Sequence, residues 1–271
     1  MIGVGMKPAP VIFIKNTMHE LSETQRNRYS RHLMLSEIGE SGQKKLLEAR
    51  VLVVGLGGLG SPISYYLSAA GVGCLGIIDS DVVDISNLQR QIIHSTDTIG
   101  MPKVLSAKQT INRLNPDVKV ITYQDRFTDE NSVDIVQKYD VVVDASDNLQ
   151  ARYVINDACL ASNKPFVHGS IFQFEGMATV FFPKEGPCYR CLYPTPPPEW
   201  VLPGPTDIGL LGVLPGVIGA IEATETIKLI LGIGETLKGK LLIYDALNME
   251  FQTLEVKVNP ECGRHNSQSM E

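Results

Sequence analysis

The sequence of 271 residues has little of what marks several classes of protein. Its five cysteines are an odd number and too few for the disulfide framework of a small secreted domain. No apolar run is long enough to span a bilayer, and Lys and Pro interrupt the opening residues 1–18. Basic residues are in deficit, 24 against 30 acidic, which argues against broad binding to nucleic acid or an anionic membrane. We expect a cytoplasmic protein whose anionic ligands meet a local cluster of positive charge.

Hydrophobic residues make up 44% of the sequence and charged residues 20%, which is enough material for a core. The clearest architecture lies in ARVLVVGLGGLGSPISYYLSAAGVGCLGIIDSD, residues 49–81. The run 51–54 predicts a buried strand, the glycines after it a tight turn, and a helix over 63–70 leads to a second strand over 74–79. This βαβ unit predicts parallel strands joined by a right-handed crossover.

The alternation of helix and strand continues to residue 170. The predicted helices are 102–115, 130–138 and 148–163, and the predicted strands are 118–123, 140–146 and 165–170. Residues 172–182 change to a period of two, which indicates antiparallel strands, and two late strands are expected over 240–246 and 251–258. The predicted fold class is therefore α/β, with a doubly wound, mostly parallel, Rossmann-like sheet that continues into antiparallel strands.

We expect residues 1–20 to form an N-terminal extension and residues 21–271 to form one domain. Within it, a nucleotide-binding part covers about 49–170 and an antiparallel part about 171–265. Six of the sixteen prolines fall within 193–205, so the stretch at about 193–208 is expected to be a mobile crossover. An apolar helix is predicted over 209–232, where Pro215 can introduce a kink, and it is expected to pack in the core and at a dimer interface.

The glycine turn GLGGLG fits the fingerprint of a dinucleotide-binding fold. Its glycines are Gly55, Gly57, Gly58 and Gly60. Asp79 ends the following strand, where a carboxylate can accept hydrogen bonds from ribose hydroxyls. Because NAD enzymes share this pattern, the turn by itself predicts a nucleotide site without identifying the nucleotide.

The residues after the second strand favour ATP. The candidate cofactor-binding residues in DSDVVDISNLQRQ, just past the ribose carboxylate, are Asp81, Asn87, Gln89 and Arg90. Lys103 follows at the start of the next predicted helix, and Arg28 and Arg31 lie upstream. Guanidinium and ammonium groups of this kind are what a triphosphate requires when the whole protein is acidic.

A carboxylate suited to a metal follows another predicted strand. VVDASDN places Asp147 and Asn148 beyond the carboxyl end of the strand over 140–146, which is the edge where open α/β sheets bind ligands. A carboxylate beside phosphates is a natural ligand for Mg²⁺. The sequence then has candidate ligands for a ribose, for phosphates and for a metal, which predicts ATP with Mg²⁺.

The runs GLGGLGSP, DSDVVDISNLQRQ, IGMPKV, VVDASDN and CYRCLYP together resemble the MoeB/ThiF/HesA adenylyltransferases, the bacterial and archaeal relatives of ubiquitin-activating enzymes. The resemblance extends from about residue 21 to residue 265, and SNLQRQ is its most specific part. It implies a substrate, the C-terminal Gly-Gly carboxylate of a ubiquitin-like sulfur carrier protein. It also implies that Arg31 reaches the γ-phosphate from the other subunit of a homodimer. The remaining implied contacts are Gly58 to the phosphates, Asp79 to ribose, Asn87, Arg90 and Lys103 to the phosphates, and Asp147 to Mg²⁺.

The chemistry implied for these residues is electrostatic. A C-terminal carboxylate has a pKa of about 3.5, so it is ionised at neutral pH and attacks the α-phosphate without a general base. The obstacle is that an anion must approach a polyanion, and positioned charges lower such a barrier. We therefore expect the catalytic residues to be Arg31, Arg90, Lys103 and Asp147.

The sequence departs from the family at the crossover. Many relatives keep a cysteine there that can link to the activated carrier, whereas alignment of GLLGVLPG places Pro205 at that position. Cys74 and Cys159 lie in predicted core elements and are expected to be inert. We therefore expect adenylation without an enzyme-bound thioester, followed by attack of an external persulfide or sulfide donor. Because the sequence ends at residue 271, we expect it to lack the rhodanese-like domain that some members carry.

Cys188 and Cys191 in GPCYRCLYP have the spacing of a metal or redox pair. The relatives complete a zinc site with a second such pair near the C-terminus, where this sequence has Cys262 and His265. Three thiolates and one imidazole are a known closed set for Zn²⁺, which would fasten the C-terminal tail to the sheet. A redox pair is the alternative, although such pairs open a helix and this one is bracketed by prolines. A lost or unfilled site is the third possibility.

Two other classes of function stay open at this point. An NAD(P)-dependent oxidoreductase needs the same glycine turn but gives no role to Arg90, Lys103 and Asp147. A non-catalytic subunit would lend Arg31 to a related partner. His94 and His168 show no carboxylate or thiol partner in the sequence pattern, so we expect them to make hydrogen bonds in the core or in loops.

Overall fold

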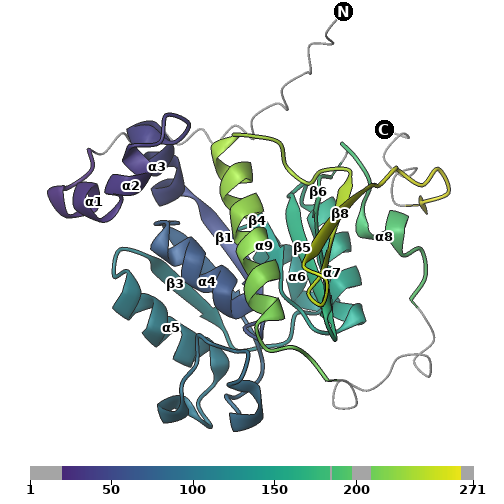
Figure 1. The fold of residues 1–271 in the computed structure, drawn as a ribbon, viewed down its shortest axis with the longest axis horizontal. Helices are drawn as coiled ribbons and strands as arrows, with labels where there is room; N and C mark the ends of the chain where they lie inside the picture. Colours follow the sequence, from purple (N-terminus) through teal and green to yellow (C-terminus); the bar gives the residue numbers. More distant parts are fainter. Residues whose placement is uncertain (1–19, 184, 197–208, 264–271) are drawn as a thin grey trace, which may run out of the picture.

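The computed structural model describes residues 20–183, 185–196 and 209–263. An eight-stranded sheet in the order β3-β2-β1-β4-β5-β6-β7-β8 forms its centre (Figure 1). The strands are β1 Arg50–Val54, β2 Cys74–Ile78, β3 Lys119–Tyr123, β4 Val141–Asp144, β5 Phe166–Phe172, β6 Glu175–Phe181, β7 Lys240–Asp245 and β8 Glu250–Glu255. The first five are parallel and the last three run antiparallel, which confirms the predicted α/β class.

Helices cover both faces of the parallel strands. The helices of the described residues are α1 Glu23–Arg28, α2 Ser30–Leu33, α3 Gly39–Glu48, α4 Gly60–Ala69, α5 Lys103–Leu114, α6 Asp129–Val136, α7 Leu149–Ala161, α8 Tyr189–Leu192 and α9 Leu214–Leu231, with short 3-10 turns η1 Ile85–Asn87 and η2 Thr96–Thr98. One core packs α3, α4, α5 and α9 against one face, and a second core packs α6, α7 and α8 against the other. None of the described helices is long and apolar enough to cross a membrane.

Strand β1 shows why its sequence is a continuous apolar run. Val51 and Val53 belong to the core under α4 and α9, whereas Leu52 and Val54 point to the core under α6 and α7. A parallel strand buried on both faces has no solvent side to occupy with polar residues. Its neighbours β2 and β4 lie on opposite sides of it, so the order of strands reverses at β1. That reversal leaves a crevice at the carboxyl ends of β1 and β4, where such sheets bind ligands.

Helix α9 differs from the prediction. It begins at Leu214 rather than at residue 209, and Pro215 lies in its first turn instead of kinking its interior. The first turn of a helix has no partners for its N–H groups, so proline fits there without loss of a hydrogen bond. The predicted kink is therefore wrong.

The N-terminal helices α1 to α3 were not assigned from the sequence, and they pack at the amino ends of the parallel strands. Helix α3 leads directly into β1, and the Arg28 guanidinium donates to the Leu114 carbonyl, 2.9 Å away, at the end of α5. The Tyr29 hydroxyl accepts from the buried Asn115 amide over 2.9 Å. Figure 1 shows the three helices together at one end of the molecule.

Candidate functional site

The glycine turn brings the end of β1 against the end of β4. Gly55 has φ +97°, and a Cβ at this position would lie 2.6 Å from the carbonyl oxygen of Ala145, so only glycine fits. The next residues lead into α4, whose N-terminal flanking residue, Leu59, provides no side-chain cap. Uncapped N–H groups at the start of a helix are suited to an anion such as phosphate.

Gly58 lies where the glycine turn, the start of α9 and Arg90 come together. A Cβ at Gly58 would lie 3.0 Å from Pro215 at the start of α9 and 3.6 Å from Cγ of Arg90. The half-buried Arg90 therefore extends over the glycine turn, and its Nη1 makes one long hydrogen bond, of 3.4 Å, to the Ser86 carbonyl. Its guanidinium keeps most of its donors for a ligand.

The Asp79 side chain stabilises the same turn through hydrogen bonds. One carboxylate oxygen accepts from the backbone N–H of Leu56 and the other from that of Asp81, each over 2.8 Å. A carboxylate has about four acceptor positions, so both oxygens keep capacity for ribose hydroxyls. The side chain is half-buried at the carboxyl end of β2.

Lys103 and Asp81 form an ion pair at the start of α5, with Nζ 2.8 Å from Oδ2. The lysine side chain is only 5% exposed, whereas the aspartate side chain is 62% exposed. We predicted Asp81 to contact the cofactor, and in this structure its carboxylate neutralises Lys103. An approaching phosphate would compete with that carboxylate for the ammonium group.

The buried His94 connects α5 to the glycine turn. Its Nε2 donates to the Leu56 carbonyl over 3.0 Å, and its Nδ1 lies 2.9 Å from the Ser106 hydroxyl. Burial lowers the pKa of His94, so the ring is neutral at pH 7. The expectation that His94 makes core hydrogen bonds is confirmed.

The remaining predicted residues differ in how many of their side-chain polar atoms already have hydrogen-bond partners. Asn87 accepts from the Gln91 amide over 3.1 Å, and Gln89 lies against Gly212 just before α9. Asn148 caps α7, because its Oδ1 accepts from a backbone N–H, so its carboxamide oxygen already has a structural role. Asp147 is exposed beyond the end of β4, and its carboxylate has no hydrogen-bond partner among the described residues.

Arg31 does not join the site within this chain. It is an exposed residue of α2, at the amino ends of the strands, whereas the glycine turn lies at their carboxyl ends. Its closest recorded partner is the Met34 sulfur, 4.0 Å from Nη1. Arg31 can therefore act at this site only if a second copy of the chain supplies it.

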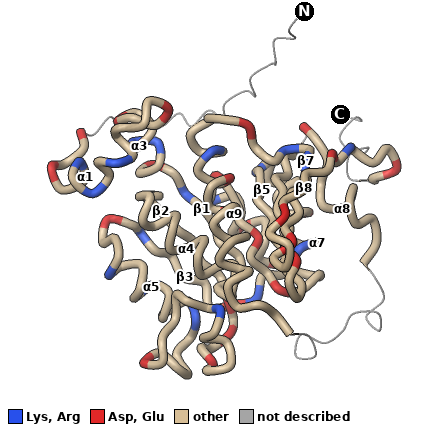
Figure 2. Tube along the Cα trace, viewed as in Figure 1, with Lys and Arg blue, Asp and Glu red and all other residues tan. Residues whose placement is uncertain are grey.

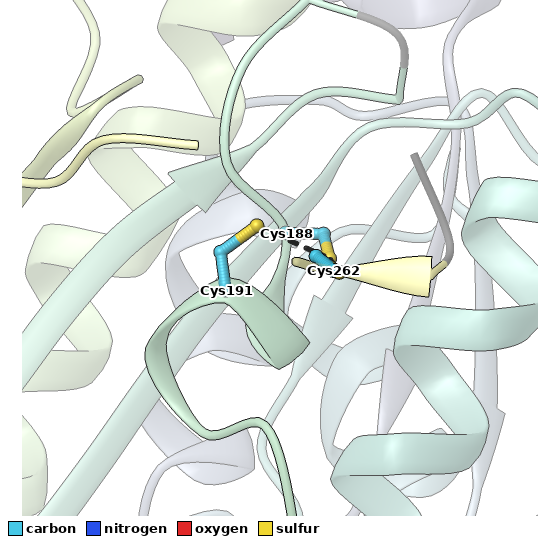
Figure 3. Close-up of side chains that lie close together, drawn as sticks. All are labelled: Cys188, Cys191 and Cys262. Atoms are coloured by element: carbon cyan, nitrogen blue, oxygen red, sulfur yellow. Dashed lines mark hydrogen bonds between the residues drawn. The ribbon is translucent and has the colours of Figure 1, made fainter. Parts of the chain in front are cut away.

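Three cysteines form a separate cluster (Figure 3). The Cys188 sulfur lies 3.9 Å from that of Cys191 and 3.7 Å from that of Cys262. Burial and the neighbouring thiols raise the pKa of Cys188 to about 12, so a bound cation would be needed to ionise this thiol at neutral pH. Three thiols at this spacing fit three of the four positions of a tetrahedral zinc site. The predicted fourth ligand, His265, lies outside the described residues.

One argument against a redox pair was wrong. Cys188 directly precedes the four-residue helix α8, so the pair does open a helix despite its flanking prolines. The raised pKa of Cys188 is nonetheless the opposite of the lowered pKa of reactive redox cysteines. Leu160, near the end of α7, packs on the cluster, about 16 Å along the helix from its start beside Asp147. The cluster is thus remote from the glycine turn.

Comparison with known proteins places this arrangement in a family. A family model described as the ThiF family matches residues 29–264. The chain belongs to the ThiF family. It is 50% identical to the SAMP-activating enzyme E1 of Haloferax volcanii over 89% of either chain. It is 46% identical to the sulfur carrier protein adenylyltransferase of Thermus thermophilus, over 89% of this chain and 91% of that protein.

A longer protein and a solved structure are also similar to this chain. The adenylyltransferase and sulfurtransferase MOCS3 of Culex quinquefasciatus is 48% identical over 90% of this chain, which spans 56% of that protein. The crystal structure of E. coli MccB with ATP superposes with a TM-score of 0.77 at 23% identity, over 88% of this chain and 74% of MccB. The predicted resemblance is confirmed, and membership of the ThiF family favours an adenylyltransferase over an NAD(P)-dependent oxidoreductase.

Sequence reasoning missed one polar pair of this ThiF-family chain. His168 and Asp144 are cross-strand partners in β5 and β4, 1% and 0% exposed, with Nδ1 2.8 Å from Oδ2. His168 therefore makes the expected core hydrogen bond, but the inference that it lacks a carboxylate partner was wrong. A single sequence gives each strand but not the register that sets these two residues opposite each other.

Proposed function

We propose that this chain uses ATP and Mg²⁺ to adenylate the C-terminal glycine carboxylate of a ubiquitin-like sulfur carrier protein that ends in Gly-Gly, with release of pyrophosphate. The observation that carries the proposal is 50% identity, over 89% of either chain, to a protein named SAMP-activating enzyme E1. The product would serve thiocarboxylate formation in a molybdopterin, thiamine or related sulfur-transfer pathway in the cytoplasm.

The geometry of the crevice supports binding of ATP. The glycine turn before α4 offers N–H groups to the phosphates, because those of Gly57, Gly58 and Gly60 have no backbone partner among the described residues. Arg90 and Lys103 would supply positive charge, and Asp79 has spare acceptor capacity for the ribose. Acidic and basic residues are interspersed along the described chain (Figure 2).

Asp147 fits a Mg²⁺ ion held together with ATP. Its carboxylate is exposed and unpaired among the described residues, and Ala145, two residues earlier, lies against Gly55 of the turn. Carboxylate oxygens with phosphate oxygens and waters are the usual ligands of Mg²⁺. When bound, the ion would neutralise charge on the phosphates.

The chain's own residues then have a mainly electrostatic task. The carrier carboxylate is ionised and needs no base. Arg90 and Lys103 would offset the repulsion between this anion and the triphosphate and stabilise charge as pyrophosphate leaves. Arg31 of the second subunit of a homodimer would add a third positive charge. Within one chain Arg31 lies at the amino ends of the strands, away from the glycine turn, which agrees with this role.

Sulfur would come from outside the chain. The sequence has no cysteine between Cys191 and Cys262. Burial raises the pKa of both Cys74 and Cys159, so neither presents a thiolate to a carrier. The acyl-adenylate would therefore be attacked directly by an external persulfide or sulfide donor.

Zinc would be structural. Cys188 and Cys191 from the start of α8, Cys262 from the tail after β8 and His265 would form a closed tetrahedral site. Bound zinc would hold the tail to the end of α7 and leave the chemistry to the crevice.

The direct test is mass spectrometry of a Gly-Gly carrier incubated with the purified chain, ATP and Mg²⁺. We expect a carrier species heavier by one AMP, which sulfide converts to a thiocarboxylate without any enzyme-linked carrier. Absence of the adenylate with every candidate carrier would contradict the proposal. Activity of the chain alone would also exclude the role of a non-catalytic subunit.

A further inference from the structure

The segment that carries Asp147 is fixed by the three residues before it. The Ala145 N–H donates to the Val54 carbonyl in β1 over 2.9 Å. One carboxylate oxygen of Asp144, Oδ1, accepts both the N–H of Ser146, over 3.0 Å, and its hydroxyl, over 2.6 Å. The direction in which the chain leaves β4 towards Asp147 is thus set largely by the Asp144 carboxylate.

That carboxylate depends on His168. Asp144 is completely buried, and its second oxygen accepts from His168 Nδ1 over 2.8 Å. Burial opposes ionisation of Asp144, but its bond to His168, together with the charge of Arg152 and the bond to Ser146, lowers its pKa below the usual value. An ionised carboxylate can accept both donors of Ser146, whereas a protonated one must donate a hydrogen bond from one of its oxygens.

The polar atoms of His168 serve no other described group. Burial lowers the pKa of His168, so the neutral ring has one N–H, which it donates to Asp144. Its other nitrogen, Nε2, is buried with no hydrogen-bond partner among the described residues. The rings of Phe181 and Tyr189 lie beside the imidazole, with centroids 6.2 Å and 5.2 Å away, and limit its movement.

We propose that His168 is a positioning residue for the magnesium site: through Asp144 and Ser146 it sets the orientation of the segment that presents Asp147. The inference rests on the proposed function, because it requires Asp147 to hold Mg²⁺ beside ATP. Loss of the Nδ1 donor removes one partner of a buried carboxylate, which favours its protonation and disturbs its bonds to Ser146. Hydrogen-bond partners behind a metal ligand commonly affect metal affinity by about 10- to 100-fold.

The test is calorimetric titration of the purified protein with ATP, once with Mg²⁺ and once with EDTA. His168→Leu keeps the approximate size of the side chain but removes the donor. We expect it to lose about 10- to 100-fold of the gain in ATP affinity that Mg²⁺ gives the unaltered protein. Its affinity in EDTA should stay unchanged. His168→Asn, whose amide can donate from nearly the same place, should restore most of the gain.

Two further variants make the result specific. Val167→Ala alters the neighbouring residue of β5, which is fully buried but faces the other core, so it should leave the Mg²⁺ effect intact. Ser146→Ala, which removes the 2.6 Å hydrogen bond from the Ser146 hydroxyl to Asp144, provides a second route to the same loss if His168→Leu does not fold. An unchanged Mg²⁺ effect in His168→Leu, or equal weakening with Mg²⁺ and EDTA, would overturn the inference. If Mg²⁺ fails to strengthen ATP binding to the unaltered protein, the proposed magnesium site itself is refuted.

Discussion

Replacement of Glu222 by glutamine should stabilise the protein by an amount that grows with pH. Glu222 lies in α9 with 0% exposure, and neither carboxyl oxygen has a hydrogen-bond partner among the described residues. The carboxyl group packs so closely on Gly169 in β5 that a Cβ there would overlap it. Burial, and then the charge of Asp144, raise the pKa of Glu222 well above 4.5. Between pH 4.5 and this raised pKa the folded protein therefore holds a proton that the unfolded chain releases.

The sign of the pH effect follows from that proton. Because the folded state binds more protons than the unfolded state, the free energy of unfolding falls as pH rises from 4.5 towards the raised pKa. The loss is about 1.4 kcal/mol per pH unit inside this window. Glutamine carries no titrating proton and has nearly the same shape. The advantage of Glu222→Gln should thus increase between pH 5.5 and 7.5, and the upper limit for a single proton is about 2.7 kcal/mol.

Urea unfolding of both proteins at pH 5.5 and 7.5, at one protein concentration, measures this difference. Contributions from other titrating groups cancel in the comparison between variants. Glu48→Gln, at an exposed position of α3, controls for loss of a negative charge and should show no such growth with pH. An advantage of Glu222→Gln that is equal at the two pH values would refute the assignment of a buried, protonated carboxyl group.

Three further predictions concern the site and the cysteine cluster. Arg90→Ala should fold normally and lose carrier-dependent exchange between ATP and pyrophosphate by on the order of a thousandfold, which a radiolabel assay detects; retained exchange would remove Arg90 from the site. Cys262→Ser should reduce zinc, measured by atomic absorption, well below one ion per chain and lower the melting temperature, whereas an unchanged zinc content would contradict its role as a ligand. Gly55→Ala should destabilise the fold by at least about 1–2 kcal/mol in urea unfolding, because φ is positive and the Ala145 carbonyl occupies the position of the new methyl group; full stability would refute that geometry.

Sequence periodicity predicted the parallel part of the fold well because its central strands β1, β2 and β4 are continuous apolar runs. The strand over 51–54 and the helix over 102–115 agree with β1 and α5 to within one residue at each end. The helix α8 was missed because it has only four residues, too few for a periodic pattern. The start of α9 was misplaced because an apolar run does not reveal where its first turn lies.

Site residues within one short motif could be predicted from the sequence. Contacts between residues that are distant in the sequence could not. Spacing along the chain places Asp79 and Asp147 at strand ends, which lie at the same edge of a parallel sheet. The pairing of Lys103 with Asp81, and of His168 with Asp144, depends on side-chain direction and strand register. Glu222 gave no signal at all, since a glutamate in a helix is usually exposed and only the packing of α9 on β5 buries it.

The central claim is that a Gly-Gly carboxylate and MgATP react in the crevice between the glycine turn and the end of β4. The measurement that tests it most directly is ATP–pyrophosphate exchange by the purified chain with a sulfur carrier ending in Gly-Gly and with the same carrier lacking its last glycine. We predict exchange that requires Mg²⁺ and that occurs with the intact carrier but not with the truncated one. Exchange that is absent with every intact carrier, or equal with the truncated one, would contradict the claim.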